Sequence, residues 1–179
     1  MTTLPVIHTK RLVLRPFRPD DFADALAYRN DPQFAKFLPH IPQPFTRQDA
    51  EAFVATNMAE PWDKSPVFAV EFEGRVIGTV NLEVDQGECS AMLGYAIGRA
   101  WWGQGIAVEA AQAVMAWGMK TFNLQRIWAS TDIRHVRSQR VMEKLGLQRE
   151  TIRPGKRLDR EGRRVDEAVY AISVQCFLR

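Results

Sequence analysis

The stretch that decides the fold is Gly94-Tyr-Ala-Ile-Gly-Arg-Ala-Trp-Trp-Gly-Gln-Gly-Ile-Ala107. Its first part ends an apolar segment that predicts a strand, roughly over residues 88–99. Its second part opens a predicted helix over about 105–122. Apolar residues recur in that helix at helical spacing, at Ile106, Ala110, Ala113, Val114 and Trp117. Gly103 and Gly105 therefore stand where a strand ends and a helix begins.

These two glycines suit a phosphate ligand. Glycine adopts positive φ without penalty and lets backbone approach a ligand closely. A helix N-terminus adds unpaired N–H groups and a partial positive charge, which favour a pyrophosphate. A tight turn that binds nothing would use the same glycines, so the pair leaves both interpretations open. The sequence has neither the Gly-x-x-x-x-Gly-Lys-Ser/Thr motif of P-loop proteins nor the Gly-x-Gly-x-x-Gly motif of dinucleotide-binding folds.

Over residues 11–60 the sequence predicts one strand and two helices. Residues 11–17 form an apolar, β-branched strand that Pro residues terminate, and a helix is expected to follow it. Four prolines in the segment 31–45 exclude a regular helix there and indicate a functional loop. Thr46 and Asp49 have the spacing of a capping box, which predicts that the second helix begins there and runs to about Glu60.

The remaining segments predict a mixed sheet. Five further strands are expected, at 67–72, 76–84, 126–131, 147–158 and 164–175. A fourth helix is expected over 135–144, with Gly146 just beyond its end. The sequence therefore predicts an α/β fold whose mostly antiparallel sheet of about seven strands is flanked by about four helices. We find no repeat or linker, so one domain over residues 1–179 is expected.

The bulk composition excludes several classes of protein. Of the 179 residues, 46% are hydrophobic and 25% are charged, as in ordinary globular proteins. No apolar run approaches the roughly 20 residues that span a bilayer, and no signal-peptide pattern is present. Cys89 and Cys176 form neither a C-x-x-C motif nor a disulfide framework, so a reducing cytoplasm is the expected location.

The basic residues are most concentrated in one segment near the end of the chain. The net charge is only +3, which makes nucleic acid an unlikely partner. Six of the basic residues nevertheless fall within twelve positions, at Arg153, Lys156, Arg157, Arg160, Arg163 and Arg164. A solvated hairpin, an acidic acceptor and the phosphates of a cofactor all remain open as explanations.

The glycine-bearing loop resembles the acetyl-CoA signature of the GNAT superfamily of N-acetyltransferases, Arg/Gln-x-x-Gly-x-Gly/Ala. Gly105 and Ala107 fill its last two defined positions, whereas Trp102 stands where the signature has Arg or Gln. Loops that read Trp-Gly-x-Gly-x-Ala followed by Glu-Ala are typical of its ribosomal-protein-alanine N-acetyltransferase branch, and Glu109-Ala110 complete that pattern here.

Two further motifs extend the resemblance along almost the whole chain. The branch opens with Thr-x-Arg-Leu-x-Leu-Arg and a following Asp, here Thr9-Lys-Arg-Leu-Val-Leu-Arg15 and Asp20-Asp21. It closes with Asn-x-x-Ser and Glu-Lys-Leu-Gly, here His135-Val-Arg-Ser138 and Glu143-Lys-Leu-Gly146. His135 thus replaces the usual Asn.

The resemblance implies where acetyl-CoA binds. It assigns the pyrophosphate to the loop residues Trp102, Gly103, Gln104, Gly105, Ile106 and Ala107. It also implies that the fourth strand carries a bulge and diverges from the fifth. The pantetheine arm would lie in that gap and pair with the backbone of Tyr95, Ala96 and Ile97. A backbone N–H near Ile97 would then face the thioester oxygen, where a donor stabilises the charge that develops.

Three side chains receive roles with alternatives. Ser138 is the candidate proton donor to the departing thiolate, unless it only bonds a carbonyl of its own helix. His135 is a candidate pantetheine ligand or base, unless it is a surface histidine. Lys144 is a candidate ligand of the 3′-phosphate, unless it only complements its helix end. Arg157 occupies the position where some members have a catalytic Glu, so no base is assigned.

The resemblance therefore implies an acetyl-CoA-dependent N-acetyltransferase. The acceptor would be a primary amine of a protein N-terminus or a small molecule, which attacks directly in a ternary complex without a nucleophilic residue. The alternative is a CoA-binding sensor or partner-binding module that has lost catalysis. His8 and His40 lack metal-ligand spacing, so no metal is expected. A monomer and a homodimer both remain open.

Overall fold

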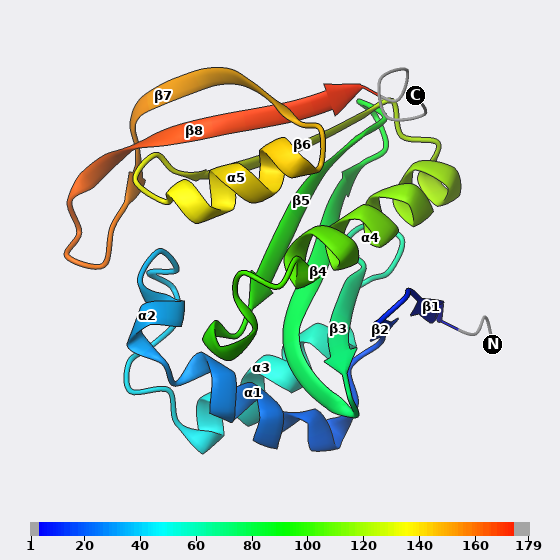
Figure 1. Ribbon diagram of the computed structural model, residues 1–179, viewed down its shortest axis with the longest axis vertical. Coiled ribbons are helices and arrows are strands. Elements are labelled where there is room, and N and C mark those ends of the chain that lie inside the picture. The colour runs from blue at the N-terminus through cyan, green and yellow to red at the C-terminus, as the bar shows by residue number, and fades with distance from the viewer. Residues whose placement is uncertain (1–3, 174–179) are drawn as a thin grey trace.

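The computed structural model describes residues 4–173, in which eight strands form one sheet (Figure 1). The strand order is β1-β2-β3-β4-β5-β6-β8-β7, and every neighbouring pair is antiparallel except β5 and β6. The strands are β1 (Ile7–His8), β2 (Leu12–Arg15), β3 (Val67–Phe72), β4 (Arg75–Asp85), β5 (Ser90–Ile97), β6 (Arg126–Asp132), β7 (Gln148–Leu158) and β8 (Arg164–Ser173).

Within the same described residues, five α-helices and two short 3-10 helices accompany the sheet. The α-helices are α1 (Phe22–Arg29), α2 (Pro32–Ala35), α3 (Arg47–Ala59), α4 (Ile106–Phe122) and α5 (Val136–Lys144). The 3-10 helices are η1 (Pro19–Asp21) and η2 (Arg99–Trp101). The mixed, mostly antiparallel α/β fold expected from the sequence is therefore confirmed. Residues 174 and 175 of the last expected strand, and Cys176, lie outside the described residues.

Local signals located most element boundaries correctly. Thr46 accepts a hydrogen bond from the Asp49 N–H, and Asp49 accepts one from the Thr46 N–H, which is the expected capping box of α3. Gly146 follows α5 with φ +84°, and its N–H donates to the carbonyl oxygen of Glu143. These boundaries depend on neighbouring residues only, so the sequence predicts them.

Two elements escaped the sequence pattern. The two-residue strand β1 pairs with Val13 and Leu14, and it is too short to show an alternation. The segment 31–45 was expected to hold no regular helix, yet it contains α2, so that prediction was wrong. Pro32 lies in the first turn of α2, where its missing N–H costs nothing, and the Asp31 carboxylate accepts from the N–H of Gln33.

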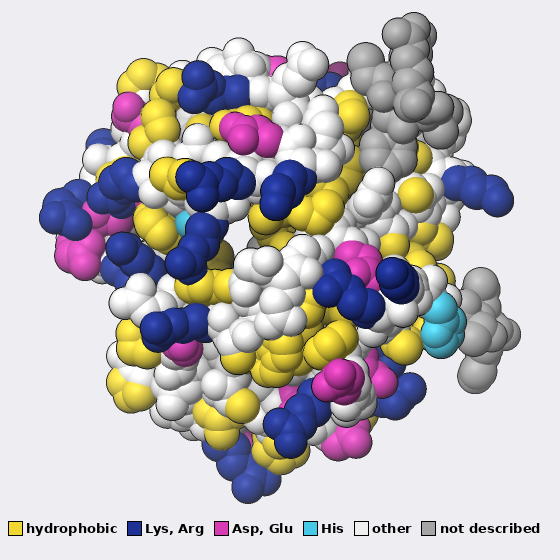
Figure 2. Space-filling model, in the orientation of Figure 1, with side chains coloured by type: hydrophobic (Ala, Val, Ile, Leu, Met, Phe, Trp, Pro, Cys, Tyr) yellow, Lys and Arg dark blue, Asp and Glu magenta, His cyan; other side chains and the backbone are white. Residues whose placement is uncertain are grey.

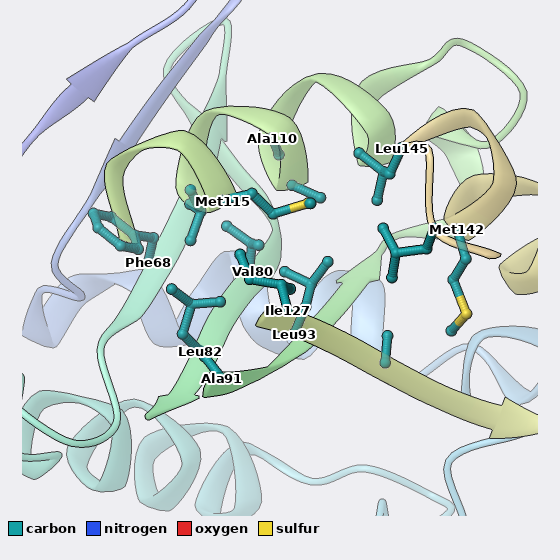
Figure 3. Close-up of a cluster of buried hydrophobic side chains, with 14 of the residues drawn as sticks. Phe68, Val80, Leu82, Ala91, Leu93, Ala110, Met115, Ile127, Met142 and Leu145 are labelled. Atoms are coloured by element: carbon teal, nitrogen blue, oxygen red, sulfur yellow. The ribbon is translucent and has the colours of Figure 1, made fainter. Parts of the chain in front are cut away.

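The sheet is covered on both faces by apolar clusters. In β3, Phe68 and Val70 belong to one cluster, whereas Val67 and Ala69 belong to the other, as the two-residue period of a strand requires. The first cluster lies under α4 and α5, where strand side chains meet Met115 and Leu145 (Figure 3). The second packs against α1, α2 and α3. No helix within residues 4–173 is long and apolar enough to cross a membrane.

The two parallel strands diverge soon after they begin. Pairing between β5 and β6 covers only Ser90–Met92 of β5 and Arg126–Trp128 of β6. Beyond that point β5 continues beside β4 alone, and β6 continues beside β8, so the two strands separate as Figure 1 shows. The implied divergence is therefore present in this structure, and it leaves one edge of β5 free.

The implied bulge in the diverging strand is absent. The register between β4 and β5 is continuous from the pair Gly78–Ile97 to the pair Asp85–Ser90. A Cβ at Gly78 would collide with the carbonyl oxygen of Ala96, so glycine at this position permits regular pairing at close approach. The expectation of a bulge here was wrong.

Candidate active site

A cleft of about 590 Å³ opens at the free end of β5. Its walls come from the end of β5, the loop before α4, the first turn of α4, the exposed side of α5 and the segment 33–38. The predicted cofactor residues that line it are Tyr95, Ala96, Ile97, Trp102, Gly103, Gly105, Ile106, Ala107, His135, Ser138 and Lys144. Gln104 does not line it, because its side chain turns back to donate to the carbonyl oxygen of Ala100.

The cleft is strongly basic. None of its described lining residues is an Asp or a Glu, whereas five are Lys or Arg. Figure 2 shows Lys and Arg side chains gathered around the hollow beside α5. The five are Lys36, Arg134, Arg137, Arg140 and Lys144. Such a surface favours an anionic ligand through its summed field.

The glycine junction has the backbone that the sequence predicted. Gly103 and Gly105 adopt φ values of +78° and +76°. Gly105 is the N-cap residue of α4 and provides no side chain to bond the N–H groups of the first turn. These N–H groups therefore remain available at the N-terminus of a 17-residue helix, on the cleft side.

Hydrogen bonds between Glu109, Arg11 and Thr9, here called the latch, fix this loop from the side away from the cleft. The Glu109 carboxylate accepts from the Arg11 side chain (2.6 Å), from the Arg11 N–H (2.9 Å) and from the Thr9 hydroxyl (2.7 Å). Arg11 also donates to the carbonyl oxygen of Gln104 (2.9 Å). Burial acts to raise the pKa of Glu109, but the bonds from Thr9 and Arg11 hold it below its usual value. The motifs at the start of the chain and of α4 thus form one unit.

The end of β5 offers its backbone groups to the cleft at alternate residues. Gly98 donates its N–H to the carbonyl oxygen of Ile77 on β4 (2.8 Å). Because hydrogen-bonded and non-bonded residues alternate along an antiparallel pair, Ala96 also turns its backbone toward β4. Tyr95 and Ile97 turn theirs to the free edge. The backbone pairing expected for Ala96 is therefore corrected, whereas Tyr95 and Ile97 remain suitable.

The hydroxyl groups of Tyr95 on β5 and Ser138 on α5 lie next to each other in the cleft. The Tyr95 hydroxyl donates to the carbonyl oxygen of Ser138 (3.0 Å) and lies 3.0 Å from the Ser138 hydroxyl. Ser138 is only 7% exposed, and burial raises the pKa of Tyr95 to about 12. Tyr95 therefore stays protonated near neutral pH. The partner of the Ser138 hydroxyl is this phenol rather than a carbonyl of its own helix.

His135 is half-buried and stacked, unlike a surface histidine. Its ring lies on that of Phe37, with centroids 4.2 Å apart, and its Nδ1 lies 3.3 Å from the Thr131 hydroxyl. Burial lowers the pKa of His135 to about 4, and the nearby Arg137 acts in the same direction. The ring is therefore neutral at pH 7 and is a weak base.

Sequence reasoning missed part of the basic wall. Arg137 and Arg140 line the cleft together with Lys144, because residues three and four apart share one face of α5. That spacing was readable in the sequence, and it would have identified both arginines. Phe37, which also lines the cleft, had no such signal, because it comes from an irregular segment.

The acidic residues near the expected position of a base are engaged elsewhere. Glu150 pairs with Arg126, and Asp159 pairs with Arg134 and Arg163. Glu167 is 7% exposed and accepts from the Ser130 hydroxyl (2.8 Å). None of the three lines the cleft.

The basic hairpin between β7 and β8 makes hydrogen bonds to a distant part of the chain. Arg160 donates to the carbonyl oxygens of Ala35 (3.1 Å), Leu38 (3.0 Å) and Ile41 (2.9 Å), which ties the hairpin to the segment around α2. Arg163 pairs with acidic residues of its own turn. Arg160 is exposed, as a solvated hairpin predicts, but its guanidinium is also bonded to a distant segment of the chain.

The described residues show no metal centre. Within residues 4–173, no group of three or more His, Cys, Asp and Glu side chains is arranged to hold an ion. That the protein works without a metal stays a prediction.

Comparison with known proteins identifies the family. The family model of the acetyltransferase (GNAT) domain matches residues 11–148, which include the glycine junction and most of both cleft walls. The chain belongs to this family. The protein is therefore an acetyl-transferring enzyme.

Individual relatives agree with this assignment. An uncharacterized N-acetyltransferase of Bacillus subtilis strain 168, YnaD, is 35% identical over 144 residues, which cover 80% of this chain and 83% of the relative. A GNAT-family acetyltransferase structure from Bacillus anthracis is 30% identical, with a TM-score of 0.83, and covers 94% of this chain and 98% of that one.

A more distant likeness concerns the fold alone. The ribosomal-protein-S5-alanine acetyltransferase of Vibrio fischeri superimposes with a TM-score of 0.81. It is 21% identical, and the alignment covers 94% of this chain and 96% of that one.

Proposed function

We propose that this GNAT enzyme transfers the acetyl group of acetyl-CoA to a primary amine, which attacks directly in a ternary complex. The observation that carries the proposal is one continuous cleft. It combines an uncapped helix N-terminus, a basic helix face and a strand edge with free backbone groups. A pyrophosphate, a cationic wall for further phosphate and an extended amide-containing arm fit these three features in turn.

The phosphate end of the donor would be held by α4 and α5. The uncapped N–H groups after Gly105 and the partial positive charge of the helix N-terminus favour the pyrophosphate. Arg137, Arg140 and Lys144 supply cations from α5, and Lys144 is the candidate for the 3′-phosphate. Gln104 would contribute only through the loop backbone, since its side chain lies outside the cleft.

The reacting end would be held by β5. The backbone of Tyr95 and Ile97 faces the free edge and is suited to pair with the amides of pantetheine. The Ile97 N–H is then the donor that faces the thioester oxygen. A preorganised N–H in a site of low water content stabilises the negative charge that develops there.

Proton transfer would use the two hydroxyl groups. As the carbon–sulfur bond breaks, Ser138 donates its proton to the thiolate. Tyr95, 3.0 Å away, can turn its O–H from the Ser138 carbonyl oxygen to restore that proton, and it regains its own proton from water. No described carboxylate lines the cleft, and His135 is a weak base. We therefore expect the attacking amine to lose its proton to water. His135 would instead form, with Phe37, the wall at the reacting end.

The preferred acceptor class is a protein N-terminus. The motifs at Thr9–Arg15, Trp102–Ala110 and His135–Gly146 support the ribosomal-protein-alanine acetyltransferase branch, whose fold the chain shares with the Vibrio fischeri protein. A small-molecule amine is the second acceptor class to test. The proposal takes residues 1–179 as one catalytic domain.

The test measures release of the CoA thiol. The protein is incubated with acetyl-CoA and a panel of peptides with different N-terminal residues, together with a matched panel of small amines. Mass spectrometry of the acceptor, before and after, reports the acetyl group itself. Turnover with any peptide above the rate of hydrolysis supports the proposal. Calorimetric binding of CoA without turnover on both panels would favour the inactive sensor instead.

A further inference from the structure

Trp102 connects the two halves of the cleft through two different parts of its indole ring. Its Nε1–H donates to the carbonyl oxygen of Ile97 at 2.6 Å. Its ring lies under the guanidinium of Arg137, with Cζ 4.6 Å from a ring centroid. All three residues line the cleft, and they come from the loop before α4, from β5 and from α5.

We propose that Trp102 is a positioning residue that orients the Ile97 backbone with its N–H and presents Arg137 to the donor phosphates with its ring face. This inference rests on the proposed function, because it names what aligns the two ends of the same acetyl-CoA site.

The indole N–H of Trp102 provides a hydrogen-bond donor for a backbone carbonyl oxygen at the end of β5. Ile97 turns its N–H and carbonyl away from β4, and its partner strand β6 has already diverged. Ile97 is 6% exposed, and a carbonyl left unpaired in such a place carries a desolvation cost. The indole N–H satisfies this oxygen and fixes the peptide plane. The N–H of Ile97, on the same edge, is thereby held toward the cleft.

The face of the indole holds a cation. Arg137 has no ion pair with any Asp or Glu in the described part of the chain, and it donates no hydrogen bond there. A guanidinium stacked on an aromatic face keeps its in-plane N–H groups free for a phosphate. Trp102 carries no charge itself, so the cation beside it on the cleft side of the glycine loop comes from α5.

The two roles can be separated because they use different parts of one side chain. Trp102→Phe keeps an aromatic face and removes the N–H. We expect kcat to fall about tenfold, because the Ile97 N–H loses its fixed orientation. The KM for acetyl-CoA should change less than twofold. Arg137→Gln should show the opposite pattern, with KM for acetyl-CoA raised about tenfold and kcat nearly unchanged.

Trp128→Phe is the matched control. Trp128 lies on β6 outside the cleft, and it also carries an arginine over its ring, with the Arg153 Cζ 5.9 Å from the centroid. This variant should keep the parent kcat and KM. If it lowers kcat as much as Trp102→Phe does, general loss of packing explains both results and the inference fails.

Amide hydrogen exchange and calorimetry, which need no turnover, accompany the kinetic measurements. Amide hydrogen exchange of the segment 94–98 should speed up in Trp102→Phe and not in Arg137→Gln, whereas the calorimetric Kd for CoA should rise only in the second variant. If Trp102→Phe is too unstable to assay, 3-benzothienylalanine at position 102 removes the N–H and keeps the two-ring shape.

Each negative result would overturn a different part of the inference or of the proposed function. Unchanged kcat and exchange in both N–H-deficient variants would overturn the role of the indole N–H. An unchanged Kd in Arg137→Gln would overturn the role of the ring face. If the parent protein itself does not bind CoA, the proposed function fails, whatever the variants do.

Discussion

At the scale of single residues, we expect the chemistry of the cleft to depend on hydroxyl groups rather than on acids. Ser138 and Tyr95 lie 3.0 Å apart, and the described lining residues contain no carboxylate. A hydroxyl next to a protonated phenol is a suitable proton donor for a thiolate, which needs only one proton on departure.

Replacement of Ser138 tests this role. Ser138→Ala should lower kcat roughly 100-fold, with little change in the affinity for CoA, because the change removes a proton donor and no phosphate contact. Steady-state kinetics and calorimetry measure the two quantities. Tyr95→Phe should cost less, since water can restore the Ser138 proton. Parent-like turnover in Ser138→Ala would leave protonation of the thiolate to solvent.

His135 makes stability depend on pH in a predictable direction. The pKa of His135 is about 4 in the folded protein and about 6.5 in an unfolded chain. The unfolded state therefore binds the proton first as pH falls, and this contribution to stability is complete above pH 6.5 and is lost between pH 6.5 and 4. Between pH 7 and 4.5 the parent should therefore lose about 2 kcal/mol more of its free energy of unfolding than His135→Asn does.

Denaturant titrations at both pH values measure this difference. Equal pH dependence in parent and variant would mean that His135 titrates normally in the folded protein.

At the scale of elements, the proposed donor site depends on a few backbone groups at the junction between β5 and α4. Gly103 and Gly105 both need positive φ, and the latch of Glu109 with Arg11 and Thr9 fixes them from behind. The loop is therefore preorganised, which limits the entropy lost when a ligand binds.

Replacement of Gly105 tests the junction. Gly105→Val places a branched side chain at φ +76°, beside the N–H groups of α4, and should raise the Kd for CoA at least tenfold. Gly74→Val is the matched control, because Gly74 has the same φ in the β3–β4 turn and open space around it. Both variants carry backbone strain, so equal affinity for CoA in the two would show that the loop is only a turn.

At the scale of the whole molecule, segments far apart in sequence close the cleft. The hairpin between β7 and β8 reaches the segment around α2, as Figure 1 shows, and Arg160 bonds three of its carbonyl oxygens. The same segment supplies Phe37 to the wall beside His135. We therefore expect the acceptor side of the cleft to depend on this long-range contact.

Loss of the contact should affect the acceptor and not the donor. Arg160→Gln should raise KM for the acceptor several-fold and leave KM for acetyl-CoA unchanged, because the segment 33–38 loses its anchor while α4 and α5 keep theirs. Arg163→Gln is the control, since its partners lie in its own turn. A rise confined to acetyl-CoA would assign the hairpin to the donor phosphates instead.

The sequence by itself determined the order of most of the elements, the glycine junction and the resemblance to the family. These features rest on local rules: apolar spacing defines each helix and strand, Thr46 and Asp49 cap α3, and positive φ requires glycine before α4. Each rule involves residues that are neighbours in the chain. The pattern therefore predicted the cleft residues of β5, the glycine junction and α5 more fully than those of the segment 33–38.

Only the tertiary structure decided which groups face the cleft and in what state. The free backbone of Ile97 follows from where β6 leaves β5, and the neutral ring of His135 follows from its stacking on Phe37. Arg160 meets carbonyl oxygens more than a hundred residues away. Contacts between distant segments leave no periodic trace in a sequence, because any residue of suitable shape and charge can make them once the sheet brings the segments together.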